Sequence, residues 1–123
     1  MVIVDTHAAL WFLQGDRHLS RVARETIEDE LIERRLSAVS VWEVAVKSSV
    51  GKLTVPPNFH RLLYEQGLST LPVTDRHALR VTGLPLHHRD PFDRLLVAQA
   101  QAEGMSILSS DVKLHAYDVD VIW

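Results

Sequence analysis

Short runs rich in apolar residues alternate along the chain with longer stretches whose apolar positions recur every three or four residues. The runs predict β-strands at residues 1–4, 36–39, 70–73, 105–108 and 119–123. The longer stretches predict helices at residues 6–14, 20–35, 40–50, 58–66, 74–81 and 90–103, with a short turn or helix from 110. This alternation predicts a three-layer α/β fold, a short parallel sheet of roughly four or five strands with helices on both faces.

The first predicted strand ends on an acidic residue. Residues 1–4 carry no charged side chain and lead directly into Asp5, as expected of a strand that is buried on both faces. Asp5 then lies at the carboxyl end of the strand, the edge of a parallel sheet where ligands bind. Because Thr6 is available to cap the following helix, capping explains Asp5 poorly. Asp5 is therefore a candidate functional residue.

Length and composition indicate one ordinary globular domain over residues 1–123, with 46% apolar and 24% charged residues. The chain has no cysteine, which excludes a thiolate metal site and fits a cytoplasmic protein. The apolar runs are shorter than the roughly 18 residues that a membrane span needs, so we expect no membrane association. A net charge of −3 argues against a protein that coats nucleic acid, but it is compatible with an enzyme that has a local basic rim.

Further acidic residues lie where predicted strands give way to helices. Glu43, Asp93 and Asp111 occupy such junctions or first helical turns, as Asp5 does. A parallel sheet brings these junctions to one edge, so we expect the carboxylates to meet in a cleft. Like charges at close range repel one another unless a cation is bound between them. Because the expected ligands are all oxygens, the pattern predicts a site for Mg²⁺ or Mn²⁺.

Helix capping is the alternative explanation for three of these acids. Ser40 and Glu43 have the spacing of a capping box, in which Glu43 bonds back to the Ser40 amide. The segment Asp90-Pro91-Phe92-Asp93 has the pattern of a capping Asp, a proline and an acid in the first turn, so Asp90 competes with Asp93 for the functional role. Asp111 follows a serine as an ordinary cap does. Capping is the commoner explanation at each place taken singly, whereas the joint pattern favours a shared site.

Basic residues flank the expected cleft. Lys47, Arg89 and Arg94 are candidates for holding substrate phosphates, although they equally serve to balance the acids. We expect the histidines to be structural or surface residues. The neighbours His87 and His88 point to opposite faces if their segment is extended, so both binding one metal ion is not expected.

Several motifs resemble those of the PIN-domain ribonucleases and, within them, the VapC toxins of bacterial toxin–antitoxin pairs. They are VDTHAALW at 4–11, SVWEVAVK at 40–47, LPLHHRDPFDRLLVAQA at 84–100 and SSD at 109–111. The resemblance covers essentially the whole chain, and DPFDR is its most specific part. The family's acidic positions match Asp5, Glu43, Asp93 and Asp111, while Ser109 stands where many relatives have threonine. The resemblance implies an endoribonuclease that hydrolyses RNA phosphodiester bonds with Mg²⁺ or Mn²⁺. It also implies a cognate VapB antitoxin and a homodimer.

Other classes of protein remain as alternatives. A receiver-type phospho-acceptor module needs a pair of acids after the first strand, and Asp5 has no acidic neighbour. A haloacid-dehalogenase-like phosphatase needs a second Asp two residues after the first, where this chain has His7. A PIN-fold protein that only binds a partner is the third alternative, and the intact set of acids argues against it.

Overall fold

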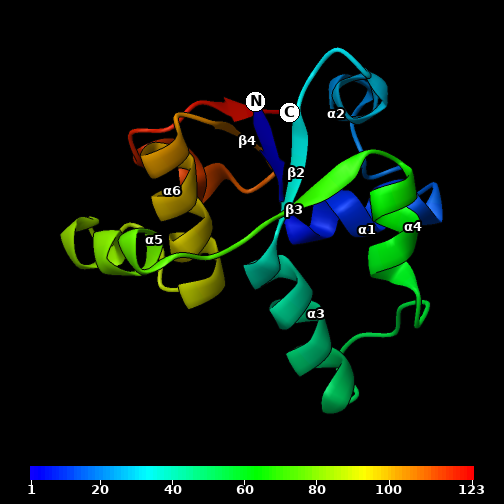
Figure 1. The fold of residues 1–123 in the computed structure, drawn as a ribbon, viewed down its shortest axis with the longest axis horizontal. Coiled ribbons are helices and arrows are strands. Elements are labelled where there is room, and N and C mark those ends of the chain that lie inside the picture. The colour runs from blue at the N-terminus through cyan, green and yellow to red at the C-terminus, as the bar shows by residue number, and fades with distance from the viewer.

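The computed structural model describes residues 1–123, and a five-stranded parallel sheet lies at its centre (Figure 1). The strands are β1 (Val2–Val4), β2 (Arg34–Ser37), β3 (Leu68–Leu71), β4 (Ser106–Leu108) and β5 (Val121–Ile122). They lie in the order β3-β2-β1-β4-β5. The register aligns Val4 with Leu36 on one side and with Leu108 on the other. The segments that follow β1, β2 and β4 therefore start from the same edge of the sheet.

Helices cover both faces of this sheet, as predicted. The helices are α1 (Thr6–Gln14), α2 (Arg21–Glu28), α3 (Ala38–Ser49), α4 (Phe59–Glu65), α5 (Asp75–Arg80) and α6 (Pro91–Glu103), with 3-10 turns η1 (Val81–Gly83) and η2 (Val112–Ala116). Figure 1 shows α1, α2 and α4 to one side of the strands and α5 and α6 to the other. Helix α3 extends away from the edge at which β1 and β2 end. No helix is long and apolar enough to cross a membrane.

The central strand divides the core into two parts. Val2 and Val4 point into a cluster that includes residues of α1, α2 and α4. Ile3 points the opposite way, into a cluster formed mainly with α6 and the segment after β4. Side chains alternate between the faces of a strand, so an uninterrupted apolar strand is what a sheet covered on both faces requires.

The second strand and the following helix begin earlier than predicted. The strand is Arg34–Ser37 rather than 36–39, and α3 starts at Ala38 with Ser37 as its N-cap. Arg34 falls within the helix predicted at residues 20–35, where a charged side chain is expected on the solvated face, but it is buried in the strand. Its guanidinium donates to the carbonyl oxygens of Ile27 and Gln66. Long-range hydrogen bonds therefore make a buried arginine acceptable in this strand.

Helix α2 is shorter than its apolar pattern predicts. The apolar positions Ala23, Ile27 and Leu31 recur every four residues and predict one buried stripe. Ala23 and Ile27 are buried, but the helix ends at Glu28, and Leu31 lies in the loop and is 96% exposed. The Asp29 side chain accepts a hydrogen bond from the Leu31 amide at 2.9 Å. Such a local turn competes with continuation of the helix.

Candidate active site

Asp5 ends β1 and is at the same time the N-cap of α1. Its Oδ1 accepts a hydrogen bond from the Ala8 amide at 2.7 Å. The expectation that Thr6 caps this helix is wrong, because Thr6 is its first residue. Asp5 is buried, which raises the pKa of its carboxyl, while hydrogen bonding to the Ser109 hydroxyl and the Ala8 amide opposes the rise. The site therefore holds an acid whose charge is only partly compensated.

The capping explanation of Glu43 is wrong. Because α3 begins after Ser37, Glu43 lies beyond its first turn, and Ser40 is a helical residue whose buried hydroxyl has no partner. Glu43 is itself only 4% exposed. Its Oε1 accepts a hydrogen bond from the Thr6 hydroxyl at 2.7 Å, and its Oε2 lies 2.5 Å from Lys47 Nζ. Glu43 thus points back toward α1 and not toward the amides of its own helix.

The start of α6 separates the roles of its two acids. Asp90 is the N-cap, and its Oδ1 accepts from the Phe92 amide at 2.8 Å and the Asp93 amide at 3.4 Å. Asp93 makes no capping bond and contributes to the wall of a cleft. Burial and the neighbouring Asp90 carboxylate raise the pKa of Asp93 to about 7, with smaller contributions from Glu43 and Asp5, despite the opposing charge of His88. Asp90 is therefore explained by helix capping, whereas Asp93 is the candidate for a functional role in the cleft.

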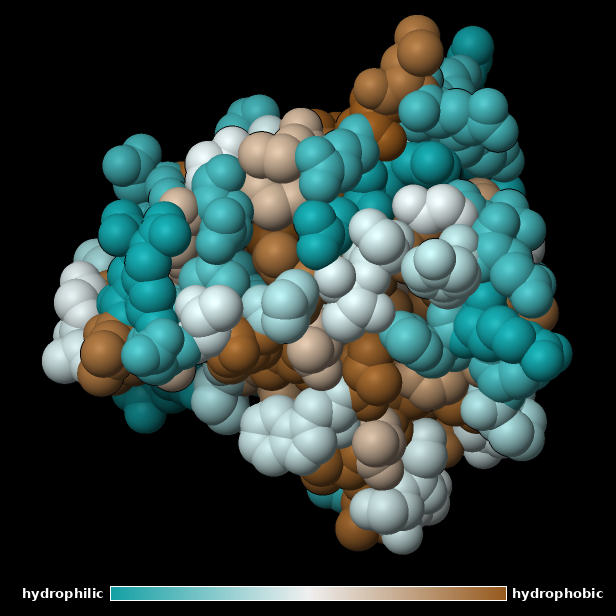
Figure 2. Space-filling view, viewed as in Figure 1, coloured by the Kyte–Doolittle hydropathy of each residue, from teal (hydrophilic) through white to brown (hydrophobic).

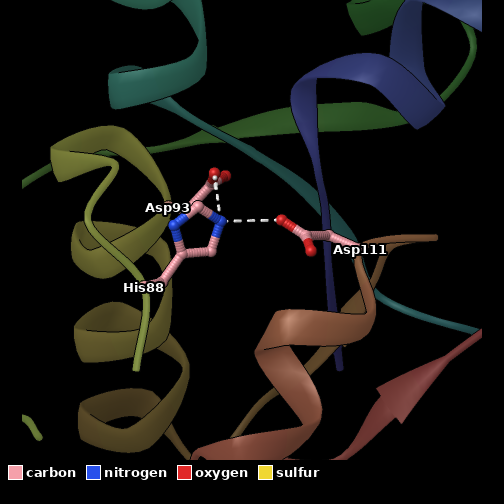
Figure 3. A group of neighbouring side chains, drawn as sticks. All are labelled: His88, Asp93 and Asp111. Atoms are coloured by element: carbon pink, nitrogen blue, oxygen red, sulfur yellow. Dashed lines mark hydrogen bonds and ion pairs between the residues drawn. The ribbon is translucent and has the colours of Figure 1, made fainter. Parts of the chain in front are cut away.

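His88 lies between Asp93 and Asp111 (Figure 3). Its Nε2 is 2.8 Å from Asp111 Oδ2 and 3.2 Å from Asp93 Oδ2. His88 is buried, whereas His87 is exposed and packs against Tyr117. From the sequence we expected His88 to be a structural or surface histidine. Its position between two acids of the candidate site was not predicted. Its adjacency to the motif around Asp90 was the only local signal.

The hydrogen bonds of His88 determine which ring nitrogen carries a proton. The Asp90 amide donates to Nδ1 at 3.1 Å, so this nitrogen acts as an acceptor. In the neutral ring the proton then resides on Nε2, which faces Asp93 and Asp111. An imidazole in this state donates hydrogen bonds and offers no lone pair to a metal ion at Nε2. The carboxylates, and not His88, are therefore the candidate ligands.

Asp111 both caps η2 and faces the cleft. Its Oδ1 accepts from the Lys113 amide at 3.0 Å, which is the ordinary capping role, while its Oδ2 contacts His88. Partial burial tends to raise the pKa of Asp111, but the hydrogen bonds from Lys113 and His88 outweigh it and lower the pKa below its usual value. Asp111 therefore ionises more readily than Asp5 and Asp93, whose pKa values are raised.

These acids border a cleft of about 310 Å³. It is lined by Asp5, His7, Trp11, Asp93, Ser110 and Asp111. Glu43 is close enough that its charge raises the pKa of both Asp5 and Asp93. Burial is the main cause of both raised pKa values, and repulsion between the neighbouring carboxylates adds to it. The donor set, which consists of oxygen atoms, fits a hard divalent ion.

The basic residues differ in their surroundings. Lys47 is paired with Glu43, and this hydrogen bond raises the pKa of Lys47. Arg94 donates to the carbonyl oxygens of Val81, Leu84 and Pro85, which ties α6 to the segment before it. Arg89 is exposed. Phosphate binding by any of the three stays a prediction.

Similar proteins are known in both sequence and structure. The chain is 28% identical over 121 residues to ribonuclease VapC22 of Mycobacterium tuberculosis, which covers 94% of this chain and 91% of that protein. A chain of a toxin–antitoxin complex from Klebsiella pneumoniae aligns with a TM-score of 0.70 and 17% identity, over 100% of this chain and 97% of that one. A chain of VapBC2 from Rickettsia felis, bound to a promoter DNA fragment, aligns with a TM-score of 0.68 and 12% identity, over 99% and 98%.

The match to a protein family decides between the classes of protein that the sequence left as alternatives. Residues 2–120 match the family described as PIN domain, which confirms the fold class and excludes the receiver and dehalogenase alternatives. The parallel sheet and the cleft between α1, α6 and the segment after β4 are consistent with that match. The chain belongs to the PIN domain family.

Proposed function

We propose that this protein is an endoribonuclease that hydrolyses RNA phosphodiester bonds with the aid of Mg²⁺ or Mn²⁺. The observation that carries the proposal is the convergence of acids from distant parts of the chain, namely Asp5, Glu43, Asp93 and Asp111. The similarity to a VapC ribonuclease supports RNA as the substrate. The protein then acts as the toxin of a toxin–antitoxin pair.

Asp5, Asp93 and Asp111 are the residues that would hold the divalent ion at the open side of the cleft. A bound divalent ion lowers the pKa of a water molecule and stabilises negative charge on the phosphoryl oxygens. Asp5 Oδ1 accepts from the Ala8 amide, and the Ser109 hydroxyl also bonds to this carboxyl, so a metal ion would share the Asp5 oxygens with these two donors. His88 holds a proton at Nε2 beside Asp93 and Asp111, which fixes the orientation of both carboxylates.

Glu43 would bind the divalent ion only if its ion pair with Lys47 rearranges. Both Glu43 oxygens have partners, Thr6 at Oε1 and Lys47 at Oε2. The Thr6 hydroxyl orients the carboxylate, and Lys47 is the partner that can move because its side chain is 32% exposed. Once released, the Lys47 ammonium is positioned beside the cleft to attract a phosphate.

An antitoxin partner follows from the same proposal. Solved structures of similar chains are toxin–antitoxin complexes. We propose that the antitoxin places an arginine in the acidic cleft, because a guanidinium binds carboxylates through two parallel hydrogen bonds and competes with the metal ion. Helix α3 adds an exposed apolar stripe of Trp42, Val46 and Val50, which lie four residues apart. Figure 2 shows hydrophobic surface on the lower part of the molecule, where α3 lies in Figure 1.

Exposed apolar surface of this kind is typical of protein interfaces. The antitoxin or a second copy of this chain is a suitable occupant, and the homodimer stays a prediction. A protein that only binds partners is the alternative function. Purified protein incubated with RNA in Mg²⁺, Mn²⁺ or EDTA decides between them, because a binding protein leaves the RNA intact under every condition.

A further inference from the structure

One wall of the acidic cleft is aromatic. Besides the acids, the cleft is lined by the rings of His7 and Trp11. These residues are four apart on α1 and share one face of it, with ring centroids 6.0 Å apart and planes at 48°. Asp5 is the N-cap of the same helix. Helix α1 therefore presents a carboxylate of the site and two rings to the same cleft.

The Trp11 ring is held in place by other rings. His18 stacks on it with centroids 5.4 Å apart and planes at 26°. Trp123 contacts it in a tilted arrangement at 5.9 Å. His18 is itself fixed by Asp16, whose Oδ1 lies 2.6 Å from Nδ1. A ring already held in one orientation loses little freedom when a ligand stacks on it.

The lining of the cleft offers a nucleic acid no lysine or arginine to contact its phosphates. The whole chain has a net charge of −3. Attraction between cationic side chains and the RNA backbone, which usually provides most of the affinity, is therefore weak at this point. Stacking of a base on an aromatic side chain provides affinity that does not depend on charge.

We propose that Trp11, together with His7, forms a stacking subsite for an RNA base that flanks the cleaved bond. The inference rests on the proposed function. A phosphodiester held at Asp5 and Asp93 brings the bases of the adjoining nucleotides beside the same wall, and every base has a face that can stack. Trp11 also packs against the core next to α1, so its stacking role has to be separated from a purely structural one.

A double-mutant cycle, in which both the protein and the RNA substrate are changed, distinguishes a stacking role of Trp11 from a structural one. The substrate is an RNA whose cut site has been mapped with the wild-type protein, prepared with the base removed from the nucleotide before or after the cut. The proteins are wild type, Trp11→Phe, Trp11→Leu and His7→Ala. Tyr64→Leu is the matched control, since Tyr64 is an exposed aromatic residue on α4 outside the cleft. Each protein is assayed for kcat/KM on each RNA, and its fold is checked by thermal unfolding.

Removing one of the flanking bases should lower wild-type kcat/KM about 5- to 150-fold, the range for one stacked base. Trp11→Leu should lower kcat/KM on intact RNA by a similar factor. On the RNA without that base, its kcat/KM should be little lower than that of wild type on the same RNA. Trp11→Phe should keep most of the activity, and Tyr64→Leu should resemble wild type on every RNA. His7→Ala should show a smaller loss with the same dependence on that base, and its exposed position makes misfolding an unsuitable explanation.

Two outcomes overturn the inference. If the losses from Trp11→Leu and His7→Ala multiply fully with the loss from base removal, no base stacks on these rings, and the proposed ribonuclease function stands unaffected. If wild type cleaves no RNA with either metal ion, the proposed function fails and the subsite fails with it. If Trp11→Leu unfolds, the cycle is read from His7→Ala, for which the same criterion holds.

Discussion

The Thr6 hydroxyl donates a hydrogen bond to Glu43 Oε1 across 2.7 Å, which joins the first residue of α1 to the middle of α3. Both side chains are buried. The bond connects the helix that Asp5 caps to the helix that carries Glu43, two acids that lie 38 residues apart in the chain. This hydrogen bond therefore helps to fix the relative position of the two carboxylates.

Replacing Thr6 with valine tests this link. Thr6→Val keeps the shape of the side chain but leaves a buried carboxylate oxygen without its donor, so unfolding free energy should fall by about 1–3 kcal/mol. RNA cleavage should fall with it, because Glu43 loses its fixed orientation. Thr6→Ser should restore both quantities. Urea unfolding and RNA cleavage measure the effects, and a wild-type cleavage rate in Thr6→Val is the result that refutes the positioning role.

Glu43→Gln should separate catalysis from stability. The amide oxygen can still accept from Thr6, so the change removes mainly the ion pair with Lys47. Glu43 is buried, but the Lys47 side chain is 32% exposed and can turn to solvent, so the loss of stability should stay at about 1 kcal/mol. A neutral amide is a much weaker ligand for Mg²⁺ than a carboxylate, so cleavage should fall by orders of magnitude. Thermal unfolding and cleavage assays measure both. Near-normal cleavage removes Glu43 from the site.

Two serines near the start of α3 test which residue caps this helix, because only one of them makes a capping hydrogen bond. Ser37 is the N-cap and accepts from the Val39 amide at 3.1 Å, so Ser37→Ala should cost about 1 kcal/mol or more. Ser40 has a buried hydroxyl with no partner, so Ser40→Ala should leave stability unchanged or raise it. Thermal unfolding of the two variants in parallel gives the answer. A larger loss of stability in Ser40→Ala than in Ser37→Ala would support the capping box expected from the sequence.

The stability of the metal-free protein should depend on pH through Asp93. The folded state raises the pKa of Asp93 from 3.8 to about 7, so between these values the folded protein binds more protons than the unfolded chain. Its contribution to stability is therefore greatest at low pH and is lost as pH rises from about 4 to about 7. Asp93→Asn should be more stable than wild type above pH 7, and this advantage should shrink as pH falls. Urea unfolding in EDTA at several pH values tests the sign, and an advantage that grows toward acid pH contradicts it.

The antitoxin is expected to compete with the metal ion. If its arginine binds the cleft, added Mn²⁺ should weaken the toxin–antitoxin complex, and Asp93→Asn should weaken it further because a bidentate partner is lost. Isothermal titration with the cognate antitoxin, with and without Mn²⁺, measures both effects. A complex that leaves Asp5 and Asp93 open to solvent rules out this mode of inhibition.

The parts of this site that the sequence could predict rest on local signals. An uninterrupted apolar strand leading into Asp5, and a proline after Asp90, determine where β1 ends and α6 begins. The alternation of strands and helices is sufficient for a parallel sheet with its functional edge. These features involve neighbours in the chain, which is why periodicity and capping patterns detect them.

The remaining features depend on contacts between distant residues. Ser37 and Ser40 are both serines suited to capping a helix, and the choice between them follows from long-range contacts of β2. These are its pairing with β1 and β3 and the hydrogen bonds of Arg34 to distant carbonyl oxygens. His88 belongs to the site because Asp111, 23 residues later, meets its ring. A pair of adjacent histidines does not indicate which of the two points inward.

The most direct test of the account compares wild type with Asp5→Asn in a metal-dependent RNA cleavage assay. Asparagine caps a helix as well as aspartate does, and the Asp5 carboxyl has a raised pKa, so the metal-free variant should be as stable as wild type or more stable. Wild type should cleave RNA with Mg²⁺ or Mn²⁺ and stop in EDTA, and the folded variant should cleave with neither ion. Undiminished cleavage by wild type in EDTA, or by folded Asp5→Asn in Mn²⁺, would contradict a metal site built on these carboxylates.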